Sequence, residues 1–266
     1  MNTQSPNENS LTYTTAELID APAEFLSSLN IGSLNIIRDP RFNIHLHKVQ
    51  LLGTTITSLQ ITGCNLNKEC FDWICSLTAL KTLSLIRCNH HGLPSSLFEL
   101  KNLTDLTLEA MGMLWVPSEI GNLTSLINLA LPDNALESLP RSILKLDKLK
   151  SINLSNNAFK SIPALIFKLN GLYSLNMTSN DIEIISPMIG SLAALEHIAL
   201  SNNSIENVPT QVYLLPKLTT LLLTENLISH IPNSICLHRT LRLFDVRNNI
   251  LKSVSPGLKK MQAFRC

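Results

Sequence analysis

The sequence has almost no net charge and no long apolar segment. It contains 21 Lys and Arg residues against 20 Asp and Glu residues, which leaves a net charge of +1 at pH 7. A chain with this balance has no sequence-wide basic field that would attract nucleic acid or anionic lipid. No apolar run approaches the roughly 18 residues that a membrane-spanning helix needs. We therefore expect neither nucleic acid nor a membrane as its partner.

The sequence also lacks a recognisable secretory leader and paired cysteine clusters. Residues 1–7 have neither a basic segment nor an apolar core, which predicts that there is no Sec-type signal peptide. The cysteines do not form the flanking pairs that cap extracellular repeat proteins, so we interpret them as reduced thiols in the cytoplasm. The six are Cys64, Cys70, Cys75, Cys88, Cys236 and Cys266.

Common catalytic and nucleotide-binding motifs are missing as well. We find no G-x-x-x-x-G-K-[ST], G-x-G-x-x-G, H-E-x-x-H or G-x-S-x-G. The densest group of possible metal ligands is the first four cysteines with His90 and His91, and its spacing matches no zinc template. A buried structural role explains these side chains better than a metal site. We predict a non-enzymatic protein without a metal or a cofactor.

What the sequence does contain is nine copies of the pattern L-x-x-L-x-L-x-x-N-x-L. The first two copies begin 24 residues apart, and the later ones are spaced by 23. A fixed period of this length with this pattern is typical of leucine-rich repeats. One unit cannot bury its apolar side alone, so neighbouring units must stack into a solenoid. The copies begin at Ile56, Leu80, Leu103, Leu126, Leu149, Leu172, Leu195, Leu218 and Leu241.

Each position of the repeat has its own physical role. In the copy at residues 126–148, Leu126, Leu129 and Leu131 alternate with small or polar residues and predict a short strand. Pro140 suits the first turn of a short helix on the returning arm. We therefore predict an α/β repeat solenoid. This is a leucine-rich-repeat horseshoe with a parallel sheet on its concave side and short helices or 3-10 turns on its convex side.

Asparagine at the ninth position should form hydrogen bonds with the backbone N–H and C=O groups of a turn, because these groups have no partner in the sheet. Cys64 and Cys88 replace it in the first two copies, and Met111 replaces it in the third, which is therefore the irregular repeat. Ser186 stands where the sixth repeat should have proline. Asparagine is present in the remaining six copies, at Asn134, Asn157, Asn180, Asn203, Asn226 and Asn249.

The repeats define the predicted domain organisation. Residues 1–12 are rich in Asn and Ser and are predicted to be disordered. Residues 13–55 are predicted to form an amino-terminal cap, with a helix at 14–28 and a strand at 42–46. The alternative for this segment is a ligase-recruiting motif such as an F-box. Residues 56–266 form the solenoid of nine repeats, and Phe264 is assigned to the first position of a tenth.

The 23-residue form of the repeat, as in residues 126–146 and 149–169, closely resembles cytosolic leucine-rich-repeat proteins. These include Ras-pathway scaffolds, plant intracellular Ras-group proteins and effectors of intracellular bacterial pathogens. The resemblance covers about four fifths of the chain and implies the fold strongly. It implies function only in the broad sense of protein binding, because such repeats serve many partners.

One part of the predicted solenoid departs from the default of small and polar surface residues. The third repeat has an apolar stretch at positions that are mostly polar elsewhere, and charged residues flank it on the predicted strands. Apolar aromatic residues surrounded by charges are typical of binding hot spots. We therefore predict a protein-binding surface formed by Ile86, Arg87, Asp105, Glu109, Met113, Leu114 and Trp115.

These observations predict a monomeric module that binds another protein. The function we favour is that of a leucine-rich-repeat effector of an intracellular bacterium, acting on a host protein in the host cytosol. One alternative is an endogenous signalling scaffold of the Ras-pathway type. The other is the substrate-recognition arm of a ubiquitin ligase.

Overall fold

The computed structural model describes residues 32–37, 55–254, 256–260 and 264–266, with the single positions 22, 24 and 50. The predicted disordered residues 1–12 and the predicted strand at 42–46 lie outside the described residues, as does the helix at 14–28 apart from two positions. The chain divides into two compact units. The first is Met1–Met111 with Glu119–Leu126, and the second is Gly112–Ser118 with Ile127–Cys266.

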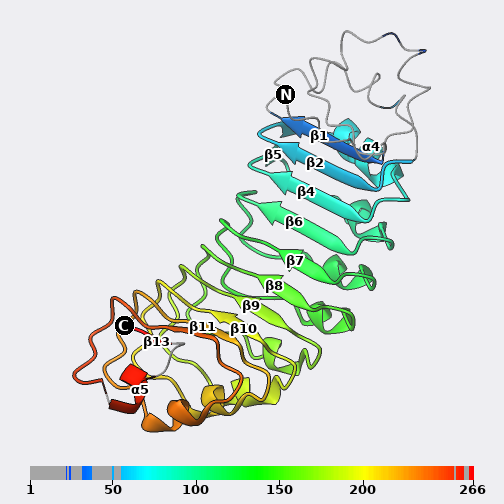
Figure 1. Ribbon diagram of the computed structural model, residues 1–266. Helices are drawn as coiled ribbons and strands as arrows, with labels where there is room; N and C mark the ends of the chain where they lie inside the picture. Colours follow the sequence, from blue (N-terminus) through cyan, green and yellow to red (C-terminus); the bar gives the residue numbers. More distant parts are fainter. Residues whose placement is uncertain are drawn as a thin grey trace, which may run out of the picture. The chain divides into compact units, whose positions relative to one another are not determined.

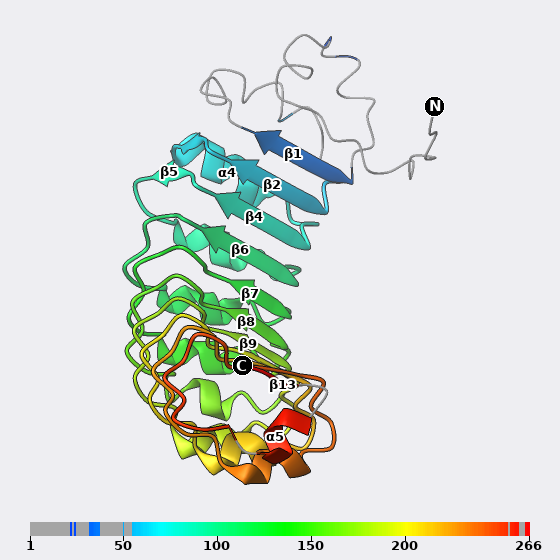
Figure 2. The same cartoon turned by 60° about the vertical axis from the view of Figure 1, so that its left-hand side comes forward.

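Among its described residues, the first unit contains four parallel strands that pair in chain order (Figure 1). They are β1 (Ser33–Ile37), β2 (Ser58–Thr62), β4 (Thr82–Ile86) and β6 (Asp105–Glu109). A second, two-stranded pairing joins β3 (Asn65–Leu66) to β5 (Asn89–His90). The arms carry the helix α4 (Lys68–Ser76) and the 3-10 helix η2 (Ser95–Glu99), and Figure 2 shows α4 behind the strands.

Strand β1 was not predicted. It lies within the segment interpreted as a cap, where Ser33 pairs with Ser58 and both Leu34 and Ile36 are buried. The signal that could have revealed it is Ile31-x-x-Leu34-x-Ile36, which repeats the first half of the consensus. The second half is missing, because no asparagine follows at the ninth position.

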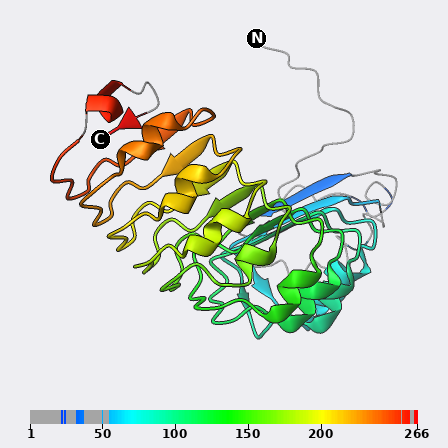
Figure 3. The ribbon, with the colours of Figure 1, turned by 90° about the horizontal axis from the view of Figure 1, so that it is seen from below.

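In the described part of the second unit there are seven parallel strands, again paired in chain order. Short 3-10 helices lie on the returning arms, and Figure 3 shows them as a row of short coils from green to orange. The strands are β7 (Asn128–Ala130), β8 (Ser151–Asn153), β9 (Ser174–Asn176), β10 (His197–Ala199), β11 (Thr220–Leu222), β12 (Leu243–Asp245) and β13 (Phe264–Arg265). The helices are η4 (Arg141–Lys145), η5 (Ile166–Lys168), η6 (Pro187–Ser191), η7 (Thr210–Leu214), η8 (Asn233–Leu237) and α5 (Pro256–Lys260). Another 3-10 helix, η3 (Ser118–Asn122), belongs to the third repeat.

The parallel strands and the short helices on the returning arms of both units confirm the predicted leucine-rich-repeat fold class. Strands β2, β4 and β6 to β12 each begin at the third position of one of the nine copies. The proline of the arm stands one residue earlier than predicted, at the N-cap of η4 rather than in its first turn. In the sixth repeat Ser186 is the N-cap instead, and its Oγ accepts a hydrogen bond from the Met188 N–H at 3.2 Å.

The asparagine ladder is formed as predicted. In the sixth repeat the Asn180 Nδ2 donates to the carbonyls of Leu154 (3.0 Å) and Met177 (3.1 Å), while its Oδ1 accepts from the Phe159 N–H at 3.0 Å. One side chain thus joins two successive turns. Cys88 takes the same place with a thiol that lies 3.4 Å from the Ile61 carbonyl.

The assignment of Phe264 to the first position of a tenth repeat is wrong. Strand β13 pairs Phe264 with Phe244, which is the fourth position of the ninth repeat. The two rings lie with their centroids 5.6 Å apart. A bulky apolar residue fits either inward position of the consensus, and only the strand register decides which one it occupies.

Candidate protein-binding surface

Four of the predicted surface residues belong to the first unit, on the adjacent strands β4 and β6. Ile86 and Glu109 are register partners at the carboxyl ends of these strands, and the Arg87 N–H donates to the Glu109 carbonyl at 2.8 Å. Asp105 lies at the opposite end of β6, roughly 13 Å away at ~3.3 Å per residue. Its carboxylate accepts a hydrogen bond from the Thr104 hydroxyl at 2.6 Å. The structure therefore brings three of the four together.

Arg87 occupies a position where the backbone turns sharply out of the strand. Its φ is 52°, and the same left-handed conformation recurs at the eighth position of later repeats. Among non-glycine residues, Asn and Asp tolerate this left-handed conformation best. In the second unit three Asn residues and one Asp adopt it. Arg87 therefore adopts a conformation that the turn dictates, which fixes the direction in which its side chain leaves the backbone.

The other three predicted residues belong to the second unit. Met113 is buried, and its backbone N–H donates to the Asn134 Oδ1 at 3.1 Å, so its side chain offers no surface to a partner. Leu114 and Trp115 are 64% and 68% exposed. By contrast Trp73, on α4, is 4% exposed and packs in the core. The apolar surface of the third repeat therefore consists of Leu114 and Trp115.

Trp115 is exposed at a bend of its arm. Leu114 and Trp115 form the bend and both face solvent, whereas the next residue, Val116, is buried. From the third to the eighth repeat the thirteenth residue faces solvent and the fourteenth is buried, whereas Val254, the fourteenth residue of the ninth repeat, is half-buried. We call this line of thirteenth residues the arm edge. From the third to the seventh repeat it consists of Trp115, Ser138, Ser161, Ile184 and Asn207.

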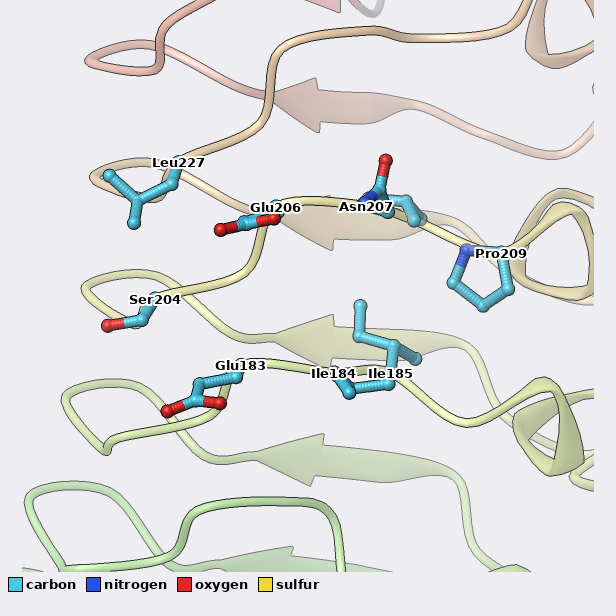
Figure 4. A pocket seen from close by; sticks show the side chains of 9 residues that line it. Glu183, Ile184, Ile185, Ser204, Glu206, Asn207, Pro209 and Leu227 are labelled. Atoms are coloured by element: carbon cyan, nitrogen blue, oxygen red, sulfur yellow. The ribbon is translucent and has the colours of Figure 1, made fainter.

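Ile184 on the arm edge was missed by the sequence reasoning. It is 69% exposed, although it stands where neighbouring repeats have Ser or Asn. That contrast was available in the sequence, but Ile also looks like an ordinary core residue beside Ile185. A hollow of about 590 Å³ opens beside it, shown in Figure 4. Its lining is Glu183, Ile184, Ile185, Ser204, Glu206, Asn207, Val208, Pro209 and Leu227.

The pKa values of several described side chains are shifted from their usual range. Burial raises the pKa of the Cys70 and Cys88 thiols, which keeps them protonated and weakly nucleophilic. The Arg247 guanidinium holds the pKa of Asp245 below its usual range, through a bond of 2.6 Å. Within the part of the chain that the structure describes, no three His, Cys, Asp or Glu side chains are grouped to hold a metal ion. None of the described helices has the length and apolarity to cross a membrane.

Comparisons with known proteins agree with this architecture. A family model described as a leucine-rich repeat matches residues 124–182. Among solved structures, a leucine-rich-repeat protein of Leptospira interrogans is 28% identical with a TM-score of 0.76, over 89% of this chain and 60% of that one. This chain therefore spans less than two thirds of the length of the Leptospira protein. No curated protein sequence matches this chain.

Two further solved structures share the fold at lower identity. The ectodomain of the Arabidopsis thaliana receptor kinase GASSHO1/SCHENGEN3 is 20% identical, with a TM-score of 0.68 over 96% of this chain and 36% of that one. An internalin of Listeria monocytogenes is 17% identical, with a TM-score of 0.59 over 94% of this chain and 91% of that one. The chain has the leucine-rich-repeat fold and is similar to leucine-rich-repeat proteins of bacteria. Such repeats are in general non-enzymatic modules for protein interaction.

Proposed function

We propose that this chain is a non-enzymatic module that binds another protein, with Leu114 and Trp115 as its principal anchor. The observation that carries the proposal is the exposure of both side chains side by side at one bend of the third repeat. Large aromatic side chains with few rotatable bonds contribute most to binding hot spots, because burying them costs little conformational entropy. Nothing in the packing of the arm requires Trp at this position, since Ser138 and Ser161 occupy the equivalent places.

A protein partner is also supported by the neighbours in fold. The Arabidopsis receptor ectodomain was solved in complex with Casparian strip integrity factor 2. We propose that the charged cluster of Ile86, Arg87 and Glu109 is a further contact surface, which orients a partner by its charges. Asp105 lies at the other strand end and would contact a different part of the same partner.

The particular role we propose is that of a bacterial effector that engages a host protein, as a monomer in the host cytosol. The likeness to proteins of Leptospira and Listeria supports a bacterial role in general terms. An endogenous signalling scaffold and the recognition arm of a ubiquitin ligase are the alternatives. A ligase core among the captured proteins would favour the last of these.

Capture from host cytosol with matched variants tests the proposal. The tagged chain is incubated with a mammalian cytosolic extract, cross-linked and analysed by quantitative mass spectrometry. The variants Leu114→Ala and Leu214→Ala both remove an exposed leucine, with 64% and 74% exposure, but only the first lies beside Trp115. We expect Leu114→Ala to reduce the captured partner while Leu214→Ala leaves it unchanged. Equal capture by both variants would place the interface elsewhere.

Affinity for the captured partner provides the quantitative test. Trp115→Ala should weaken binding by at least ~2 kcal/mol, which is roughly 30-fold in Kd. The melting temperature should stay nearly unchanged, because the side chain is 68% exposed. A loss of several degrees instead would mean that Trp115 stabilises the fold rather than the complex.

A further inference from the structure

The hollow beside Ile184 is built into the backbone of the arm. Ile184 forms parallel bridges to both Ser161 and Asn207, so three successive arms lie side by side at this point. The pairing holds Ile185 in the core and turns Ile184 outward, where it is 69% exposed. Leu227, at 44% exposure, lines the hollow from the turn of the eighth repeat. Two aliphatic side chains thus face solvent across one concavity.

Two carboxylates border the same hollow. Glu183 and Glu206 occupy the twelfth position of successive repeats, and Figure 4 shows them one above the other on the turn side of neighbouring arms. Their arms are paired, so their backbones are separated by roughly one strand spacing of ~4.8 Å. Neither carboxylate has a hydrogen bond or an ion pair within the described chain. Lys160 precedes them at the twelfth position of the fifth repeat, but it does not line the hollow.

The exposed aliphatic side chains and the two carboxylates together favour one kind of ligand in this hollow. Solvated like charges at this separation repel each other weakly, and a cation placed between them removes the repulsion. A guanidinium can donate to both carboxylates at once because its donors form a planar fork. An aliphatic side chain beside it would cover Ile184 and Leu227. The complementary ligand is therefore a basic residue next to an aliphatic one.

We propose that the hollow beside Ile184 receives an extended segment of the partner protein that carries a basic side chain next to an aliphatic side chain. This inference rests on the proposed protein-binding function and names the chemistry of a second contact. Trp115 lies on the same arm edge, three repeats away, which is roughly 15 Å at the ~4.8 Å spacing of stacked strands. An extended segment of about five residues spans that length. Ser138 and Ser161 lie between the two anchors and are small enough to let it pass.

Selection of peptides on the immobilised chain tests the inference without knowledge of the natural partner. The probe is a random library of about 12-residue peptides displayed on phage, long enough to cover the hollow. We expect enrichment of Arg or Lys adjacent to Leu, Ile or Val, and loss of that enrichment on the double variant Glu183→Gln/Glu206→Gln. No enrichment, or an enriched pool without basic residues, would overturn the proposal.

The affinity of one selected peptide, measured by fluorescence anisotropy, then locates the contact. Ile184→Ser introduces the residue that already stands at Ser138 and Ser161, and it should weaken binding at least about 10-fold. The controls are Met188→Ser, which removes another exposed side chain, and Glu137→Gln, a carboxylate at the same position of the fourth repeat. Neither control should change the affinity by more than about twofold. Equal losses in variants and controls would contradict the proposed site.

Two further readouts separate the possible failures. The effect of the double Gln variant should shrink between about 50 mM and about 500 mM salt, because the carboxylates are exposed and screened. Light scattering of the chain alone would reveal self-association, and a dimer lost on Ile184→Ser would identify a second copy as the occupant and overturn the peptide proposal. If peptide selection fails while capture of a host protein still depends on Leu114, only this inference fails and the proposed function stands.

Discussion

The loss of one ladder asparagine gives the most direct measure of what holds the repeats together. Asn180 is 8% exposed and satisfies backbone groups from two repeats. Its Nδ2 donates to the carbonyls of Leu154 and Met177, and its Oδ1 accepts from the Phe159 N–H. Asn180→Ala removes these bonds together with a longer one of 3.3 Å from Nδ2 to the Thr178 carbonyl.

The expected cost follows from the buried groups that lose their partner. An unsatisfied buried donor or acceptor costs ~1–3 kcal/mol, and the Phe159 N–H is such a donor. The Met177 and Leu154 carbonyls lose one of their two acceptor interactions, which is less costly. We therefore expect Asn180→Ala to lower the free energy of unfolding by about 1–3 kcal/mol.

A matched asparagine outside the ladder controls for the change of residue type. Asn207 lies on the arm edge with its side chain exposed, so Asn207→Ala should change the free energy of unfolding by less than ~0.5 kcal/mol. Urea denaturation followed by circular dichroism compares the two variants. Equal losses would refute the assignment of inward and outward positions, and a loss below ~0.5 kcal/mol for Asn180→Ala would refute the energetic role of the ladder.

Three further outcomes follow from the thiols, the carboxylate at the last repeat and the exposed anchors. In the native state Cys64, Cys70 and Cys88 should resist a thiol reagent because they are buried. All six cysteines should react after denaturation without reductant. Stoichiometric zinc in elemental analysis would contradict the assignment of these cysteines as free thiols. The pKa of Asp245 is lowered by Arg247, so its contribution to stability is present above its unfolded pKa and is lost as pH falls through the lower folded value. The urea midpoints of the wild type and Asp245→Asn should therefore differ at pH 7 and converge below about pH 4, and a constant difference would refute the ion pair as its cause. Adding Trp115→Ala to Ile184→Ser should weaken binding of the natural partner further, and no added loss would mean that the two side chains do not act in one interface.

The sequence predicted only part of the candidate binding surface correctly. The consensus placed Ile86 and Glu109 on neighbouring strands, because repeats of equal length put equivalent positions in register. The consensus in fact places Met113 in the core, because the eleventh position is the last leucine of the pattern, and the interpretation of Met113 as a surface residue overlooked this. The consensus did not identify Ile184, because an aliphatic residue in an arm has the same pattern whether it faces the core or the solvent.

The sequence by itself determined the repeat and its consequences. A 23-residue period with leucine at fixed places can bury its apolar side only by stacking, so the parallel strands and the asparagine ladder follow from the pattern alone. The tertiary structure decided the exceptions to the pattern. Strand β1 and the register of Phe264 depend on pairing with a neighbouring strand, which a single repeat does not encode. The exposure of Trp115 and Ile184 was also decided by the tertiary structure, because the path of each arm places the next residue, Val116 or Ile185, in the core and leaves these two side chains outside.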